Sequence, residues 1–262
     1  MTKDKKTKSV LSQARSWATQ NRLFGTQAFL RYVMFTFVEN INQVSDDFIF
    51  KGGNLLWVYI QTPRATVDLD FSTFKTFSHA VVRKVLEAAC KKNSNENEIY
   101  FSILSFKEVE QDEKQGAAVA ISYKTEQGAK NRFDIDIVYA LSCDSQQIDS
   151  PIHQELKIKT ATLENILADK ISACHRFGSG NTRMKDYDDL WRLSKSNAEV
   201  QFRKLVILAK VRKISLQLHP SWINSDMERF WSQHRQRYKG LPESLEVLMK
   251  EINDWLNRIG VS

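Results

Sequence analysis

Paired acids on two alternating segments are the residues best suited to phosphoryl chemistry. Asp68-Leu69-Asp70 and Phe133-Asp134-Ile135-Asp136-Ile137 each alternate carboxylates with apolar side chains. Because successive side chains of a strand point to opposite faces, Asp68 and Asp70 should project from one face, about 7 Å apart. Carboxylates at this separation suit one or two hard divalent cations, Mg²⁺ or Mn²⁺, and repel each other without one. The first segment therefore predicts a metal site.

A third acid would join this site if the two segments formed neighbouring strands. We expect Asp136 to be that acid, with Asp134 as the alternative. In a two-metal nucleotidyl transfer, one ion orients the triphosphate and the other lowers the pKa of the attacking hydroxyl. The competing interpretation is an edge strand whose acids are merely solvated.

A diglycine stands before the first acidic segment. Gly52 and Gly53 let the backbone approach a ligand closely, and a short helix is expected directly after them, over residues 54–60. The start of a helix offers unpaired N–H groups and the positive end of its dipole, which suits phosphate. No Gly-Lys-Ser/Thr follows, so the segment is not a Walker loop. We expect Gly52, Gly53 and Asn54 to bind nucleotide.

The hydrophobic periodicity predicts how these residues are positioned. Helical spacing is expected at both ends of the chain and strands in the middle, with turns at Gln115-Gly116 and Gln127-Gly128. The predicted strands cover residues 67–71, 99–106, 117–123 and 133–139. The predicted helices cover residues 10–20, 24–43, 77–92, 162–177, 185–196, 198–213, 225–237 and 242–258. We therefore predict an α+β fold, with residues 1–150 holding the sheet and residues 151–262 forming a helical domain.

The composition is that of an ordinary globular protein. The formal net charge is +7, and the basic residues concentrate toward the two ends of the chain, which could hold a polyanion such as RNA or be plain solvated surface. Three widely spaced cysteines form no metal-ligand pair and fit a reducing compartment. No apolar run is long enough for a membrane span and no signal peptide is recognisable, so we expect a cytoplasmic protein.

These blocks together resemble the AbiEii/AbiGii toxin family of nucleotidyltransferases, a branch related to the mycobacterial MenT toxins and to the wider polymerase-beta-like superfamily. The resemblance lies in Gly52-Gly53, in Arg64-Ala65-Thr66-Val67-Asp68-Leu69-Asp70, in Asp169-Lys170 with Arg176, and in Arg183-Met184-Lys185-Asp186-Tyr187-Asp188-Asp189-Leu190. It covers roughly residues 48–195. It implies a minimal nucleotidyltransferase sheet flanked by helices, with a helical C-terminal region.

The resemblance also implies roles for further residues. Lys170 should contact the nucleotide phosphates, in keeping with its compact charge, and Arg64, Thr66 and Arg176 should lie at the nucleotide. Asp186 should support the active site, either as a base or acceptor-orienting group or by pairing with Lys170 or Arg183 to hold its helix. We interpret Asp188 and Asp189 as exposed helix acids or partners of the helix dipole.

The resulting hypothesis is an enzyme that moves a nucleoside monophosphate from a nucleoside triphosphate to an acceptor. The family context implies the toxin of a toxin–antitoxin or phage-defence system, with tRNA as the first acceptor to test and a cognate antitoxin as a partner. A metal-dependent nuclease and a non-catalytic nucleotide- or RNA-binding module are the alternatives. The Gly52-Gly53 phosphate seat favours transfer, because a nuclease has no triphosphate to hold.

Overall fold

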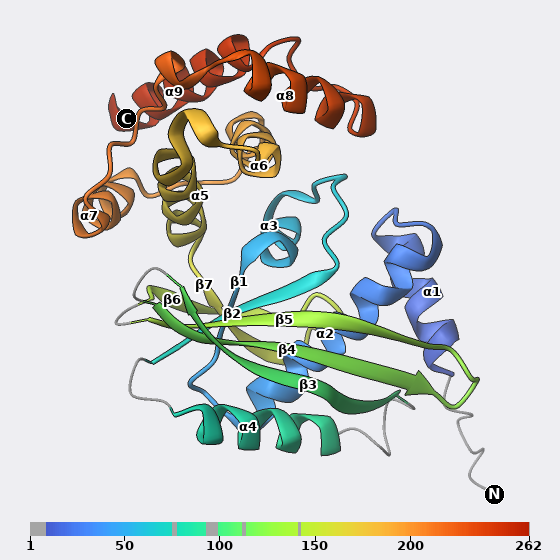
Figure 1. Cartoon of the computed structure of the whole chain (residues 1–262). Helices are drawn as coiled ribbons and strands as arrows, with labels where there is room; N and C mark the ends of the chain where they lie inside the picture. The colour runs from blue at the N-terminus through green and yellow to red at the C-terminus, as the bar shows by residue number, and fades with distance from the viewer. Residues whose placement is uncertain (1–8, 75–77, 93–98, 112–113, 141–142, 262) are drawn as a thin grey trace, which may run out of the picture. The chain divides into compact units, whose positions relative to one another are not determined.

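The computed structural model describes residues 9–74, 78–92, 99–111, 114–140 and 143–261 (Figure 1). These residues form two compact units. The first comprises the described residues up to Leu55 together with Ala65–Ala161, and the second comprises Leu56–Arg64 and the residues from Thr162 onward. The predicted boundary at residues 150 and 151 falls between two strands that pair with each other, and the unit changes only after Ala161.

The first unit is built on one seven-stranded mixed sheet of the described strands, in the order β3-β4-β5-β2-β1-β7-β6. Its strands are β1 (Ile49–Lys51), β2 (Asp68–Phe74), β3 (Ile99–Gln111), β4 (Lys114–Thr125), β5 (Lys130–Ala140), β6 (Ser145–Asp149) and β7 (Lys157–Ala161). β2 runs parallel to β5 and antiparallel to β1, whereas β3, β4 and β5 form an antiparallel meander. The predicted α+β class with a mixed sheet is confirmed.

Helices α1 (Val10–Gln20), α2 (Gly25–Val44), α3 (Gly52–Ile60) and α4 (His79–Lys91) accompany this sheet in the chain. Aromatic side chains join α2 to one face of the sheet, which we call the inner face. Phe37 lies 4.9 Å from Phe101 of β3 and 5.6 Å from Phe133 of β5, measured between ring centroids. α4 packs against both α2 and β3. Because strand side chains alternate, the residues between these aromatics lie on the opposite, outer face.

The second unit contains α5 (Leu163–Phe177), α6 (Met184–Lys195), α7 (Phe202–Arg212), α8 (Ser225–Arg237) and α9 (Leu245–Val261), with 3₁₀ turns at Gly178–Gly180 and Pro220–Trp222. Tyr187 and Trp231 are fully buried in it. Side-chain caps set two helix starts: Thr162 accepts a bond from the amide of Asn165, and Asn224 from that of Met227. Within the part of the chain that the structure describes, no helix has the length and apolarity that crossing a membrane requires.

The structure corrects one predicted turn, confirms another and adds strands that were not predicted. The turn expected at Gln115-Gly116 is wrong, because both residues lie inside β4 and Gly116 pairs with Val109 and Val138. A Cβ on Gly116 would approach the carbonyl oxygen of Ile137 to 2.3 Å, so close strand packing explains that glycine. β6 and β7 were not predicted at all. The turn expected at Gln127-Gly128 is confirmed, with a Gly128 φ of +86°.

Candidate active site

The two acidic segments are neighbouring parallel strands. The register pairs Asp68 with Asp134 and Asp70 with Asp136, so the condition set for a third acid, that the two segments are neighbouring strands, is met. Paired residues of neighbouring strands lie on the same face of the sheet. Leu69 of β2, and the β5 residues that alternate with the acids, are buried on the inner face. Four carboxylates therefore occupy one stretch of the outer face.

The four acids differ in exposure. Asp134 and Asp136 are exposed, whereas Asp68 and Asp70 are partly covered. Among the described residues no three His, Cys, Asp or Glu side chains come close enough to hold one metal ion. The expected convergence of Asp68, Asp70 and Asp136 on a single point is therefore not seen. The backbone register brings them to one face, but closing three like charges onto one point is electrostatically costly.

The Asp70 carboxylate lies directly beside Gly52, at the start of α3. Its φ of +77° is the left-handed conformation that glycine adopts without strain. A Cβ at this position would lie 1.8 Å from Oδ2 of Asp70, which is less than any non-bonded contact allows. Asp70 is also the register partner of Lys51, the residue before Gly52. The absence of a side chain at Gly52 therefore leaves room for the Asp70 carboxylate at the start of α3.

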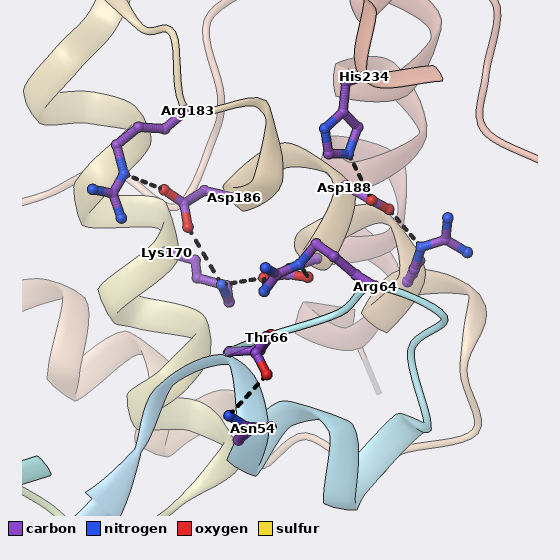
Figure 2. A network of polar contacts seen from close by, with 10 residues as sticks. Asn54, Arg64, Thr66, Lys170, Arg183, Asp186, Asp188 and His234 are labelled. Atoms are coloured by element: carbon purple, nitrogen blue, oxygen red, sulfur yellow. Dashed lines mark hydrogen bonds and ion pairs between the residues drawn. The ribbon is translucent and has the colours of Figure 1, made fainter. Parts of the chain in front are cut away.

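Asn54 fixes the approach to β2. It is 1% exposed, and its Nδ2 donates to the carbonyl oxygens of Asp68 at 2.6 Å and Thr66 at 3.5 Å. Its Oδ1 accepts a bond from Nε of Arg31 at 3.2 Å. Figure 2 shows the bond between Asn54 and the backbone of Thr66. The side chain of Asn54 therefore positions the acidic strand, a role that the sequence did not predict.

A buried ion network occupies the second unit (Figure 2). Arg64 donates from Nε and Nη2 to the two carboxylate oxygens of Asp189, at 3.0 and 2.9 Å. Lys170 donates from Nζ to Asp189 at 2.5 Å and to Asp186 at 3.3 Å. Arg64 is 8% exposed, Lys170 9% and Asp189 0%. The fork of an arginine matches a carboxylate in two parallel bonds, so the geometry favours a strong pair.

The charges in this network hold one another ionised. Burial, the largest single effect, would lower the pKa of Lys170 and Arg64. The charges of nearby acids and the hydrogen bonds to Asp189 together outweigh burial and raise both pKa values above their usual range. Burial would conversely raise the pKa of Asp189, and the charges of Lys170 and Arg64 reverse that effect and lower it. Arg64 and Lys170 are thus already partnered by acids of their own unit.

Asp186 pairs with both Lys170 and Arg183, and its other suggested role, as a base or acceptor-orienting group, stays a prediction. One oxygen accepts from Lys170, and the other accepts from Nε of Arg183 at 3.0 Å. Figure 2 shows these side chains in sequence, from Arg183 through Asp186 to Lys170. The carboxylate therefore bridges α5 and the start of α6.

The interpretation of Asp188 and Asp189 as exposed acids is wrong, since both are 0% exposed. Asp188 accepts bonds from Nε of Arg192 at 2.5 Å and from Nε2 of His234 at 2.8 Å. A run of acids near a helix start resembles a solvated first turn. Arg192 is a local partner of Asp188, but Arg64 and His234 lie far away in the chain. The one available signal was the i, i+3 spacing of Asp186 and Asp189, which places both on one helix face.

Two residues at the end of α5 contact aromatic rings. The guanidinium of Arg176 lies 4.7 Å from the ring centroid of Phe177. His175 contacts the carbonyl of Gln217 through Nε2 at 3.1 Å and packs edge-on against Trp222 at 4.9 Å. Burial lowers the pKa of His175, which favours its neutral form. A nucleotide contact for Arg176 stays a prediction.

Comparison with known proteins gives a consistent result. The model of the family described as nucleotidyl transferase AbiEii toxin, type IV TA system, matches residues 37–256, well over half of the chain. A putative nucleotidyltransferase from H. pylori is similar in structure, with 17% identity, a TM-score of 0.53, and coverage of 90% of this chain and 96% of that chain. JHP933 from Helicobacter pylori matches with 18% identity, a TM-score of 0.43, and coverage of 91% and 97%. No curated protein sequence matches the chain.

Proposed function

The chain belongs to the AbiEii family of nucleotidyl transferase toxins of type IV toxin–antitoxin systems, and on that premise we propose that it transfers a nucleoside monophosphate to an RNA hydroxyl. A nucleoside triphosphate is the donor, and tRNA is the acceptor we put first. The acceptor oxygen bonds to the α-phosphorus, and the bond from that phosphorus to the bridging oxygen of the β-phosphate breaks. Pyrophosphate leaves with the bonding electrons, and the hydroxyl proton passes to water.

One observation carries the proposal: carboxylates from β2 and β5 share the outer face, and Asp70 packs on Gly52 where α3 begins. Oxygen donors are the ligands that hard divalent cations prefer, so this donor set fits Mg²⁺ or Mn²⁺. The shared face of the sheet, rather than a ready-made cluster, supports Asp68, Asp70 and Asp136 as the residues that would hold the cation. The cation would neutralise charge at the triphosphate. The Gly52 and Gly53 backbone at the start of α3 suits an anion.

The buried network suggests a division of labour. An ammonium has three N–H donors, and Lys170 directs two of them to Asp186 and Asp189. We propose that the remaining donor contacts a phosphate, while its two acidic partners fix the position of the side chain. Arg64 is bonded to Asp189 through both arms of its fork, so we propose that it acts by holding the network.

The family also frames the biology we propose. The acceptor and the triphosphate are both cytoplasmic, so we place the activity there. A cognate antitoxin is the expected protein partner, and phage defence or growth arrest is the expected outcome of transfer. Co-expression of the neighbouring gene should restore growth to cells in which this chain is toxic. Persistent toxicity with every adjacent gene would contradict the antitoxin proposal.

Label transfer tests the reaction directly. The chain is incubated with total tRNA, Mg²⁺ and each nucleoside triphosphate in turn, labelled at either the α- or the γ-phosphorus. Nucleotidyl transfer places the α-label, and never the γ-label, on the tRNA. Transfer of the γ-label would indicate a phosphotransferase, shortened RNA a nuclease, and retention without reaction a binding module. Each of these three results contradicts the proposal.

Asp70→Asn tests the site. We expect label transfer to fall below detection while the melting temperature stays near that of the parent chain, because Asp70 is partly exposed and the change keeps its shape. Asp149→Asn is the matched control, an exposed strand acid of the same sheet whose ion pair with Lys157 lies at the surface. Full transfer by Asp70→Asn at matched Mg²⁺ would show that the assignment of the acids is wrong.

A further inference from the structure

A set of cations and one aromatic side chain lies on the outer face of β3, β4 and β5. The register pairs Tyr100 with Lys124 across β3 and β4, and Lys124 with Lys130 across β4 and β5. Arg132 follows two residues after Lys130 and so shares its face. We call Tyr100, Lys124, Lys130 and Arg132 the basic strip. Their strand neighbours Phe101, Tyr123 and Phe133 are buried on the inner face.

The surface at the basic strip is hollowed. A shallow depression of about 570 Å³ is lined by all four of its residues, and Ser102, Ser122 and Leu104 are among the other residues that line it. Leu104 stands at a break in the β3–β4 register and is 56% exposed. The volume lies within the range of small ligand sites, about 300–1,000 Å³. The hollow therefore combines apolar floor, hydroxyl groups and cations.

The cations of the basic strip carry uncompensated charge. Lys124, Lys130 and Arg132 are all exposed. Among the side chains that the structure describes, no ion pair or hydrogen bond engages their charged ends. Tyr100 is 41% exposed, and its hydroxyl donates to Glu126 at 3.1 Å, which orients the ring. Three unpaired cations beside an exposed aromatic ring complement a polyanion that also carries planar groups.

The basic strip runs into the candidate active site along β5. Lys130, Arg132, Asp134 and Asp136 stand at every second position of β5, and the intervening Phe133 and Ile135 are buried. The four side chains thus follow one another on the outer face, two cations and then two acids. At about 3.3 Å per residue, Arg132 lies about 13 Å and Lys130 about 20 Å from Asp136 along the strand. A polyanion held by the cations would reach the acids only with its end, because the carboxylates repel its backbone.

We propose that the basic strip binds the single-stranded end of the nucleic-acid acceptor, with Lys124, Lys130 and Arg132 on phosphates and Tyr100 stacked on an unpaired base. The inference rests on the proposed function, since it assigns the acceptor of that same reaction to a surface. Base stacking on an aromatic ring requires an unpaired base, which favours a single strand over a duplex. The acceptor site thus lies within the acidic central part of the sequence, outside the two basic ends.

Salt-dependent binding tests the proposal. A fluorescent single-stranded RNA of 12 nucleotides is titrated with the full chain, and anisotropy is measured at several salt concentrations. In the triple variant Lys124→Gln, Lys130→Gln, Arg132→Gln, we expect the slope of log K against log salt to fall by about 2, since each phosphate contact on a single strand contributes about 0.7. Affinity at about 0.1 M salt should fall at least tenfold.

A matched control separates the surface from net charge. Lys84, Lys91 and Lys92 are exposed at α4, away from the basic strip, and their change to Gln removes the same three charges. This control should keep the parental slope. Tyr100→Ala should weaken RNA binding about tenfold. Tyr100→Phe should bind RNA about as tightly as the parent chain, because stacking needs only the ring.

The outcomes for the surface and for the reaction are separable. The strip triple variant should raise KM for the acceptor in the label-transfer assay with little change in kcat. Equal losses in both triple variants, or none in either, would overturn the assignment of the strip, whatever the parent chain transfers. If the parent chain bound RNA through the strip but transferred no label, the proposed reaction would be refuted and the proposed RNA surface would stand. If the strip triple variant escaped inhibition by the antitoxin but bound RNA as the parent chain does, the strip would be a protein-binding surface, and the proposal would be refuted.

Discussion

Removal of the charge on Asp189 is the sharpest perturbation that the buried network offers. Asp189→Asn preserves the size of a fully buried side chain but takes away the anion that Arg64 and Lys170 share. Both cations then remain in the interior with their compensation gone, apart from the bond between Lys170 and Asp186. We expect a large loss of the free energy of unfolding.

The magnitude follows from the cost of a buried, unpartnered charge. Breaking a buried ion pair by removing one partner costs about 3–5 kcal/mol. For a chain of this size, each kcal/mol corresponds to about 2–4 °C, so the melting temperature should fall on the order of 10 °C. Replacing Arg64, Lys170 and Asp189 together with apolar residues of similar volume should recover much of that loss, since no charge stays unpaired.

Urea denaturation followed by circular dichroism and tryptophan fluorescence measures the effect. Asp226→Asn is the control, since Asp226 is 71% exposed and its ion pair with Arg229 is at the surface, where such pairs contribute little. The two variants should differ clearly in urea midpoint. If Asp189→Asn cost no more than Asp226→Asn, the buried network would not be the structural element that its geometry indicates.

The pH dependence gives a second reading of the same variant. The pKa of Asp189 lies below its unfolded value of about 3.9, so its contribution is present above that pH and is lost as pH falls through the folded pKa. The stability gap between the parent chain and Asp189→Asn should therefore be constant near neutral pH and narrow only in strong acid. A gap that closed between pH 6 and 8 would point to a different titrating group.

Two further predictions concern the first unit. Gly52→Ala should abolish label transfer, because its Cβ would overlap the Asp70 carboxylate. The control Gly128→Ala, with a similar positive φ of +86° and open space around it, should lose only a little stability and keep its activity. Equal activity in the two variants would contradict the role given to Gly52. His153 contacts Glu39 at 2.8 Å, and chiefly this hydrogen bond raises the pKa of the imidazole above 6.5. Its stabilisation is present below that value and is lost as pH rises through the folded pKa, so melting temperatures at pH 6 and 8 should differ less in His153→Gln than in the parent chain.

Much of the candidate site could be predicted from local patterns. Alternation alone places Asp68 and Asp70 on one strand face, and the same pattern at Asp134 and Asp136 suggests a partner strand. What the pattern lacks is the register: period two fixes which side chains share a face but not which residues lie opposite each other. Nor does it fix the side-chain rotamers, so alternation could not predict that the three carboxylates do not converge.

The missed elements share a physical cause. β6 and β7 are five residues each, and β6 carries mostly exposed polar side chains, so neither presents a run of alternating apolar residues. Their strand character comes from pairing with each other, and β7 also pairs with β1 through Phe50 and Thr160. Such tertiary pairing has no counterpart in a single-sequence window.

The candidate site residues divide into two physical classes that spacing alone cannot distinguish. Asp134 and Asp136 are exposed on the outer face, where water solvates a carboxylate and a ligand can reach it. Lys170, Asp186 and Asp189 are buried and form ion pairs through Lys170, so removal of one leaves a buried charge without its partner. Substitution of the first class should therefore change turnover or acceptor binding at constant stability, whereas substitution of the second should lower stability before chemistry can be measured. An inactive variant of the second class is thus evidence about catalysis only when its folded fraction is known.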